Sequence, residues 1–511
     1  MQNGIPLNIP LAVNLHIEKF SGGSVTEVES GSTNIVIDQY HDGRWYATQR
    51  PGINQLEDAS VTIADERGRG GYYWDAVGDK YIVNNDTVYK GSYAGSTMAI
   101  STGTERVFME VVGDNLVIID QENNEGWYIT SAAPTAINSI TDLDFPPNQT
   151  PALTLARGGA ELNGKLYVPT TNGGIHESDV RDPTSWGALN VRNAELESDK
   201  GVYLDKHHEH IVFFGTRTAE FFQDVANPTG STLAPRLDIS YETGCINEDC
   251  AFRVGENLYF VGQDRSNAIA VYMLSGFQLV PISGEDMSTF LTTAITQDDI
   301  KLKLSGFTSG QREFLFLTLH NTPADIVPTE TLVYSSKRTM WGFWDVQIPD
   351  VDKFPLVDWM PSTRTRAGEG ILTNGDLVTV LDDFNPQDTV GSQRVYEVGV
   401  YETGVYSATG GSGTPIPFEI ITGVITGGTP RRKRMGDLWS IHTPTDASED
   451  LTVSFADEQN TTYETHGTID ASDSDARLNR GGSFRRRNIK VSGVLTKQYQ
   501  GEMLQTTVRA G

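Results

Sequence analysis

The chain has 511 residues, too many for one ordinary hydrophobic core, so two or three domains are expected. Lys and Arg total 39 against 67 Asp and Glu, and the formal charge of −28 opposes tight nucleic-acid binding over a broad surface. The 51 glycines and 22 prolines favour many turns between short strands over long helices.

Targeting signals and disulfides are not expected. The first ten residues carry no basic stretch, prolines interrupt their apolar positions, and no apolar run is long enough to span a bilayer. We therefore predict neither a signal peptide nor a membrane-spanning segment. Cys245 and Cys250 are the two cysteines, and we interpret them as buried or reduced thiols made in a cytoplasm, although a local disulfide is geometrically possible.

The pattern of the first 45 residues predicts an arm that packs on something else. Two weak strand patterns lie around residues 11–19 and 34–40. A clear hairpin then joins residues 80–83 to 87–90 across Asn84, Asn85 and Asp86, which tolerate the positive φ of a tight turn.

The same hairpin unit recurs along the chain. Its leading strands start near residues 80, 115, 165, 210, 257, 313 and 370. This spacing, about 35 to 57 residues, is typical of propeller blades, whose radial arrangement shelters strand edges. We predict an all-β protein with a β-propeller of about six or seven blades at residues 46–390. A stack of β-sandwiches is the alternative.

The pattern changes near residue 390. Residues 407–417 are rich in Gly, Ser, Thr and Pro, which indicates a boundary or an exposed loop. Four strand patterns follow, at residues 418–425, 437–441, 451–455 and 488–492. They predict a β-sandwich-like C-terminal domain at residues 391–511, with a role in subunit or adaptor contacts.

Three motifs could carry chemistry, and we interpret each as structural. Residues 159–165 resemble a phosphate-binding loop, but Leu166 replaces the required hydroxyl residue, so Asn163-Gly164 is read as a hairpin turn. Residues 207–210, His-His-Glu-His, are read as polar blade-edge residues and not as metal ligands. Asp470, Asp473 and Asp475 lack the Gly and distal Glu of an EF-hand loop. We predict no catalytic residue, no metal and no cofactor.

Two basic clusters interrupt the acidic background of the C-terminal domain. Both are candidate partner contacts, because an Arg fork matches carboxylate and phosphate alike. A solvated or internally paired face is the alternative interpretation. The clusters are Arg431, Arg432, Lys433 and Arg434, and Arg485, Arg486 and Arg487.

The spaced motifs of residues 45–385 resemble the tail nozzle proteins of short-tailed bacteriophages, also called packaged-DNA stabilisation proteins or tail accessory factors. The Gly68-Arg69-Gly70 hairpin opening and the Trp341–Trp344 corner contribute to the resemblance. Its structural motif residues are Arg50, Pro51, Gly52, Gly215, Thr218, Glu220, Phe221, Phe222, Gly244, Cys245, Gly276, Ile282 and Ser283.

The resemblance implies a virion protein without enzymatic activity that forms a ring, usually of six copies, below the portal and its adaptor ring. The ring would retain packaged DNA and conduct it through a central channel during ejection, without specific DNA binding. Tail fibres, spikes or a needle are further expected partners. Six chains would carry about −168 charges, so an acidic channel wall would repel phosphate and let DNA slide.

A second hypothesis comes from another class of protein. The chain has carboxylates in plenty, and glycoside hydrolysis needs only two at a fixed separation across a pocket. A propeller that binds or depolymerises surface glycans should therefore show an indented pocket with two carboxylates and stacked aromatic rings.

Overall fold

The structure is a computed structural model that describes residues 5–510 with internal gaps. The residues outside this description are 1–4, 40–41, 58–66, 195–198, 310–311, 323–324, 326, 338, 349–350, 362–367, 375, 381–400, 403–413, 427–430, 445–447, 459–461, 475, 496–498 and 511. Most of the predicted loop at residues 407–417 therefore lies outside the described residues, and so does Asp475.

Six separate sheets of four or five strands lie within residues 53–380. Their strands pair antiparallel, apart from the short parallel strand β15. The first three sheets are β7 (Gly68–Trp74) to β10 (Ser96–Ala99) with β8 (Asp79–Asn84) and β9 (Thr87–Lys90); β11 (Phe108–Val112), β12 (Asn115–Asp120), β13 (Glu125–Thr130) and β14 (Ala133–Ser139); and β16 (Ala160–Leu162), β17 (Lys165–Pro169), β18 (Gly174–Asp179) and β19 (Asp182–Asn193).

The next two sheets hold the motif-rich centre of the sequence, and the last of the six includes a strand from near the N-terminus. They are β15 (Arg157–Gly158) with β20 (Gly201–His207), β21 (His210–Gly215), β22 (Ala219–Asp224) and β23 (Leu233–Tyr241); β24 (Gly244–Cys245) and β25 (Ala251–Val254) on β26 (Asn257–Gln263), then β27 (Ile269–Ser275) and β28 (Gln278–Pro281); and β35 (Leu356–Met360), β36 (Glu369–Leu372) and β37 (Leu377–Val380) with β6 (Ile53–Glu57).

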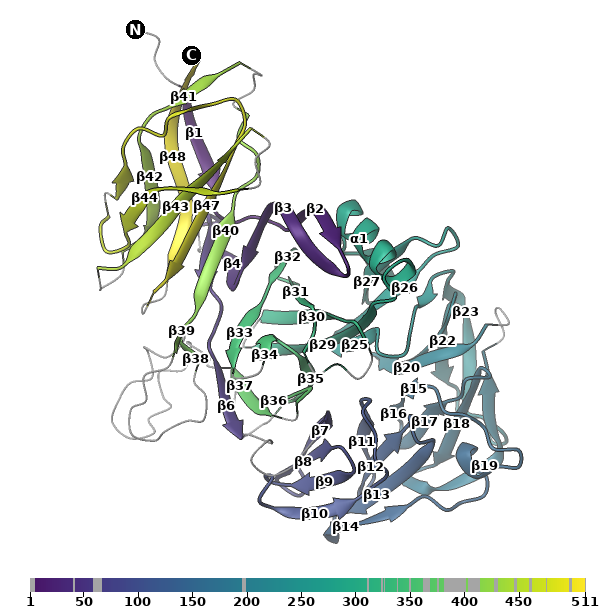
Figure 1. Cartoon of the computed structure of the whole chain (residues 1–511). Coiled ribbons are helices and arrows are strands. Elements are labelled where there is room, and N and C mark those ends of the chain that lie inside the picture. The colour runs from purple at the N-terminus through teal and green to yellow at the C-terminus, as the bar shows by residue number, and fades with distance from the viewer. Residues whose placement is uncertain are drawn as a thin grey trace.

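A seventh four-stranded unit completes the ring. It contains β29 (Lys301–Ser309), β30 (Arg312–His320), β31 (Glu330–Ser335) and β32 (Met340–Phe343), and it continues into a larger sheet. Neighbouring units contact each other in turn, and β35 contacts β7, so the ring is closed. Figure 1 shows these strands around a common centre. The predicted propeller of six or seven blades is therefore confirmed, with β6 of the early chain pairing to β37 as its closure.

Alternation along the strands distributes aromatic side chains between blades. Successive strand residues point to opposite sheet faces. On β22, Phe221 therefore belongs to the hydrophobic cluster shared with β26 and β27, and its neighbour Phe222 belongs to the cluster shared with β16 to β21. Buried side chains on the two faces of β22 therefore pack this blade against both of its neighbours.

One α-helix, α1 (Glu285–Thr296), follows β28, and a short 3₁₀ turn spans Pro146–Asn148. The acidic first residues of α1, Glu285 and Asp286, interact favourably with the positive N-terminal end of the helix dipole. Met287, Phe290, Leu291 and Ala294 form its buried stripe. Within the described parts of the chain, no helix is long and apolar enough to cross a membrane.

The C-terminal residues form a two-sheet sandwich together with the N-terminal segment, beside the propeller (Figure 1). The first sheet, here called sheet A, contains β1 (Ile5–Pro10), β4 (Ile35–Gln39), β5 (Trp45–Gln49), β41 (Lys433–Met435), β42 (Leu438–Thr443), β45 (Arg477–Leu478), β46 (Ser483–Phe484) and β48 (Gln500–Ala510). The second, sheet C, continues from β32 through β3 (Ser24–Thr33), which pairs with β2 (His16–Ser21), into β40 (Pro417–Ile421), β47 (Arg487–Val494), β43 (Asp450–Asp457) and β44 (Glu464–Asp470).

The core of the sandwich lies between sheets A and C. It includes Phe418 and Val491 from sheet C and Leu438 and Leu504 from sheet A. The predicted all-β C-terminal unit is thus present, and the N-terminal segment supplies strands to both of its sheets. Two-stranded pairs β33 (Asp345–Ile348) with β34 (Val351–Lys353) and β38 (Tyr401–Glu402) with β39 (Thr414–Pro415) complete the described strands.

Candidate functional site

The motif around Gly215 is a tightly packed turn and carries no chemistry. The Asp199 carboxylate accepts the backbone N–H of Arg217 at 2.7 Å and of Thr218 at 3.2 Å. A Cβ on Gly215 would lie 2.2 Å from Asp199 Oδ2, and a Cβ on Gly244 would lie 2.2 Å from the Arg217 nitrogen. The glycines are required because backbone and carboxylate approach too closely for any side chain.

The other motif residues of the centre hold blades together. Glu220, Phe221 and Phe222 are buried on β22, and Phe221 packs edge-on against Phe277 at 5.8 Å between ring centroids. Gly276 has a φ of +58°, typical of a hairpin turn.

The motif after β28 fixes the start of α1 against neighbouring strands. The Ile282 carbonyl accepts the Trp341 indole N–H at 2.8 Å. The Ser283 hydroxyl accepts the Val271 N–H at 3.0 Å and lies 3.1 Å from the Ser288 hydroxyl. These contacts position α1, and they use the Ser283 hydroxyl in structural hydrogen bonds.

Arg50 is a buried cross-link between the arm and the propeller. Its guanidinium donates to Asn34 Oδ1 at 2.8 Å, to the Pro51 carbonyl at 3.0 Å and to the Asp345 carbonyl at 2.7 Å. It also lies 5.3 Å from the Trp344 ring centroid. With Pro51 and the buried Gly52, Arg50 fixes the entry of the chain into β6.

The two cysteines are free thiols inside the propeller. Both are fully buried, with Cys245 Sγ 3.0 Å from the Asn247 carbonyl and Cys250 Sγ 3.2 Å from the Leu302 carbonyl. Burial raises the pKa of the Cys245 thiol to about 12 and raises the pKa of Cys250 as well. Neither is therefore a nucleophile at neutral pH.

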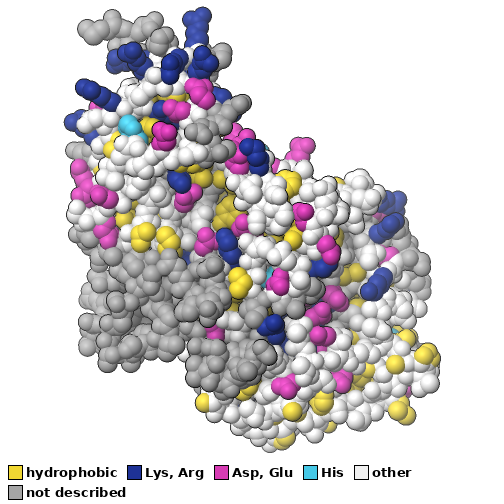
Figure 2. Space-filling model, in the orientation of Figure 1, with side chains coloured by type: hydrophobic (Ala, Val, Ile, Leu, Met, Phe, Trp, Pro, Cys, Tyr) yellow, Lys and Arg dark blue, Asp and Glu magenta, His cyan; other side chains and the backbone are white. Residues whose placement is uncertain are grey.

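The two basic clusters come together because β41 pairs with β46, with Lys433 opposite Phe484 and Arg434 opposite Ser483. Arg431, Arg432, Arg434, Arg485 and Arg486 are exposed. Figure 2 shows Lys and Arg side chains gathered on the end of the sandwich that lies away from the propeller.

Lys433 and Arg487 differ, because both are buried structural groups. Arg487 makes a bidentate ion pair with Asp457 at 2.6 and 2.7 Å, between the rings of Phe455 and Phe484. Lys433 donates to the Arg431 carbonyl at 2.7 Å. This burial corrects the prediction of a partner contact for these two residues. Partner contact by the five exposed arginines stays a prediction.

A polar cavity of about 550 Å³ lies where the inner strands of the blades meet. Burial raises the pKa of Glu110 and of Asp358, and each carboxylate has internal donors. Glu110 accepts the Tyr72 hydroxyl at 3.1 Å, and Asp358 accepts the Trp359 N–H at 2.9 Å. Asp205 lies 3.6 Å from the Arg253 guanidinium. Internal hydrogen bonds thus hold Glu110 and Asp358, and an ion pair holds Asp205.

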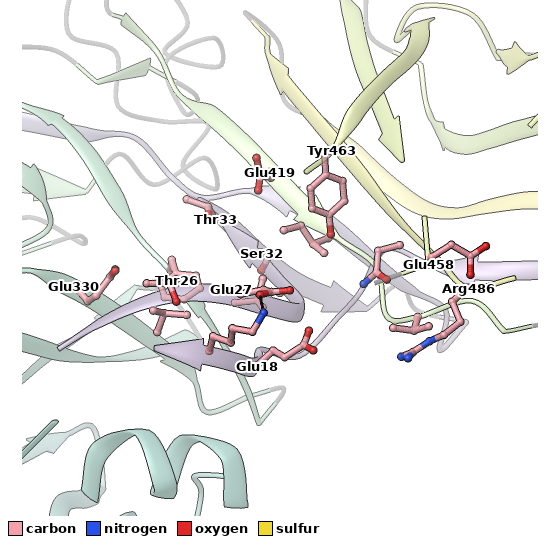
Figure 3. A pocket seen from close by; sticks show the side chains of 18 residues that line it. Glu18, Thr26, Glu27, Ser32, Thr33, Glu330, Glu419, Glu458, Tyr463 and Arg486 are labelled. Carbon is pink, nitrogen blue, oxygen red and sulfur yellow. Dashed lines mark hydrogen bonds and ion pairs between the residues drawn. The ribbon is translucent and has the colours of Figure 1, made fainter. Parts of the chain in front are cut away.

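A second cavity, the acidic crevice, lies between the β2–β3 hairpin and the C-terminal strands of sheet C. Its volume is about 590 Å³, and Figure 3 shows Glu18 and Glu27 on the hairpin side with Glu419, Glu458 and Tyr463 across from them. Glu27 pairs with Lys19, and Glu419 lies 3.1 Å from Lys490.

The histidine motif does not assemble a metal site. His207 Nε2 lies 2.6 Å from the Gly276 carbonyl oxygen, and His210 Nε2 lies 2.8 Å from the Arg236 guanidinium. Across the described residues, no group of three or more His, Cys, Asp and Glu side chains could hold a metal ion.

Sequence reasoning missed the acidic crevice and the arginines Arg477 and Arg509, which share an exposed sheet face with Arg434. The alternation of Arg509 with buried neighbours on β48 was a usable signal, since Val508 and Thr506 are buried and Arg509 is exposed. The pairing of distant strands that gathers them is not visible in the sequence.

The fold defines the class of protein: an all-β propeller with an attached β-sandwich. The propeller motif residues described above contribute to packing. The comparison with family profiles then places residues 33–354 in the family described as bacteriophage P22 Gp10, β-propeller, which stabilises packaged phage DNA. This chain belongs to that family and is a phage DNA-stabilisation tail protein of the virion.

Other comparisons add only a distant likeness. No curated protein matches the sequence. Among solved structures, the N-terminal domain of Nup159 is 8% identical with a TM-score of 0.37, covering 68% of this chain and 98% of that chain. YCF48 bound to D1 peptide is 12% identical with a TM-score of 0.39, covering 65% of this chain and 99% of that chain.

Proposed function

We propose that the chain is a structural subunit of the phage tail nozzle: copies of it, six in the complete ring, close the tail after packaging, retain the DNA and conduct it during ejection. Membership of the packaged-DNA stabilisation family over residues 33–354 carries this proposal. In it, the portal-tail adaptor ring is the upper neighbour, and fibres, spikes or a needle attach below.

The distribution of charge supports passage of DNA without adhesion. Residues 51–380 contain 23 Lys and Arg against 45 Asp and Glu, a net charge of −22. Residues 414–511 contain 12 of each sign. A propeller of this charge repels phosphate wherever it faces the DNA path, so DNA would slide past it. The C-terminal part of the sandwich, which has no net charge, is then the part suited to protein contacts.

The proposal gives the chain no enzymatic role. The buried thiols have raised pKa values, and the carboxylates of the central cavity are held by Tyr72, Arg253 and backbone N–H groups. A glycan depolymerase would need one carboxyl group to act as an acid and a second as a base or nucleophile across a sugar. The internal bonds of these carboxylates favour a structural role for them.

The test is DNA retention by particles. Heads filled by a phage mutant that lacks this protein should lose their DNA into the medium, where nuclease degrades it. Addition of the purified protein should restore nuclease resistance. Retention of DNA without the protein would contradict the proposal. In parallel, hydrolysis of host surface glycan by the purified protein would favour the depolymerase hypothesis.

A further inference from the structure

The outer face of sheet A carries three arginines and a tryptophan, here called the arginine face: Arg434, Arg477, Arg509 and Trp439. Arg434 on β41 is directly opposite Arg509 on β48, and Arg477 on β45 is directly opposite Trp439 on β42. The Arg477 guanidinium lies 5.2 Å from the Trp439 ring centroid. All three arginines are exposed, and Trp439 is 37% exposed.

This arrangement is unfavourable in an isolated subunit. Like charges directly opposite each other across two strands repel and destabilise the sheet. Among the residues that the structure describes, neither Arg434 nor Arg509 makes an ion pair. The repulsion would be relieved by an anionic partner, and an Arg fork binds carboxylates with two parallel hydrogen bonds.

The composition of the face favours a protein partner. Arg and Trp are enriched at protein interfaces and Lys is depleted. Lys433 is the single lysine of β41, β42, β45, β46 and β48, and it is buried. DNA phosphate is the other anionic candidate, and the experiment below distinguishes it from a protein partner.

The chain itself offers an acidic surface of matching kind, the acidic crevice of Figure 3. Five glutamates line it together with Lys19 and Arg486, and Glu27, Glu330 and Glu419 pair with Lys19, Lys353 and Lys490. Within the described residues neither Glu18 nor Glu458 makes an ion pair, and the Glu458 carboxylate accepts the Arg485 backbone N–H at 3.1 Å. Glu18 and Glu458 therefore hold carboxylates available to an arginine.

The two surfaces lie on opposite sides of one sandwich. On sheet C, Phe418 and Ile420 point into the core, so their neighbour Glu419 points to the outer face with the crevice. On sheet A, Leu504 and Val508 point into the same core, so Arg509 points to the other outer face. One chain cannot bring its own arginine face to its own crevice, and the contact needs a second copy.

We propose that the arginine face of one copy docks into the acidic crevice of the next copy, head to tail. This contact uses two different patches, so it generates a closed ring when the rotation between copies closes. The inference rests on the proposed ring and identifies the surfaces that would build it.

The experiment uses the full-length chain in two charge-reversed variants. The face variant carries Arg434→Glu and Arg509→Glu, and the crevice variant carries Glu18→Lys and Glu458→Lys. A control with Lys200→Glu and Arg265→Glu has the same net charge as the face variant but alters exposed propeller residues. Circular dichroism and thermal melting check that each variant is folded.

Sedimentation velocity over a concentration series then measures self-association. We expect the wild type and the control to associate, less so as salt rises, and each variant to associate at least about tenfold more weakly. Because the contact is head to tail, the two variants should associate again when mixed: the intact face of one fits the intact crevice of the other, and the reversed acidic face fits the reversed basic crevice. Under the proposal, this mixture is the distinctive result.

Three results would overturn the proposal: a wild type that stays monomeric at every concentration, a mixture that stays monomeric although the wild type associates, and a face variant that associates normally while losing affinity for duplex DNA. The last result assigns the face to phosphate. The nozzle role is judged separately, because a face variant that still restores DNA retention removes the docking contact and leaves the nozzle intact.

Discussion

Replacement of Arg69 by Ala should destabilise the propeller strongly. Arg69 is fully buried on β7, where its guanidinium donates to the carbonyls of Glu105, Asn85 and Ser101 and lies 2.8 Å from Asp120 Oδ1 of the next blade. Truncation leaves Asp120 buried with only the donors of Asn123. Loss of one partner of a buried ion pair costs about 3–5 kcal/mol.

For a unit of this size, about 2 °C of Tm per kcal/mol gives a fall of about 6–10 °C. The assay is differential scanning calorimetry of the folded chain at neutral pH. Arg265→Ala is the matched control, because its ion pair with Glu242 at 2.9 Å is more than half exposed on both sides. Such a pair contributes about 0–1 kcal/mol. An Arg69→Ala protein that melts within about 1 °C of the wild type would refute the reasoning.

Three further predictions concern the motif glycines, the thiols and the histidines. Gly215→Ala should cost about 1–3 kcal/mol, since its Cβ meets Asp199, whereas Gly423→Ala, with nothing within 4 Å, should be nearly neutral in urea unfolding. The raised pKa values of Cys245 and Cys250 predict no reaction with Ellman's reagent in the native state and two equivalents in denaturant; labelling of the native chain would contradict this. Burial lowers the pKa of His176 and of His320 to about 4, so the unfolded state binds more protons below pH 6.5 and the unfolding free energy should fall as pH drops from about 6.5 toward 4. His320→Gln should flatten this slope, and an unchanged pH profile would speak against the buried neutral form.

Local hairpins were predictable because turn chemistry and strand alternation are local. Asn163 and Gly164 have φ values of +54° and +82°, as a tight turn between β16 and β17 requires. The strand pattern that starts at Asn257 appears as β26. The pairing of Glu313–Leu317 with Leu332–Tyr334 also appears, with Leu317 opposite Leu332.

The helix α1 was not predicted, although its signals were present. Glu285 and Asp286 precede Met287, Phe290, Leu291 and Ala294, which follow helical spacing. The residues just before α1, 276–282, follow a strand pattern instead. The four Thr residues and one Ser residue of α1 also lower its helix propensity.

Pairings between distant segments could not be predicted. Ile5 lies opposite Val508 and Ile53 opposite Val380, and nothing local in the sequence specifies such registers. The same limit applies to the basic clusters. Their composition indicates a contact surface, but only the fold shows that Lys433 and Arg487 are buried and that Arg477 and Arg509 share the exposed face with Arg434.

The central claim, that this chain is wall material of the tail passage, is tested most directly by electron cryo-microscopy of the intact virion. The account predicts a ring of propellers with attached sandwiches below the portal, enclosing a channel, with the sandwich of each copy against its neighbour. Density for this protein only as separate peripheral appendages, with no lateral neighbours, would contradict it.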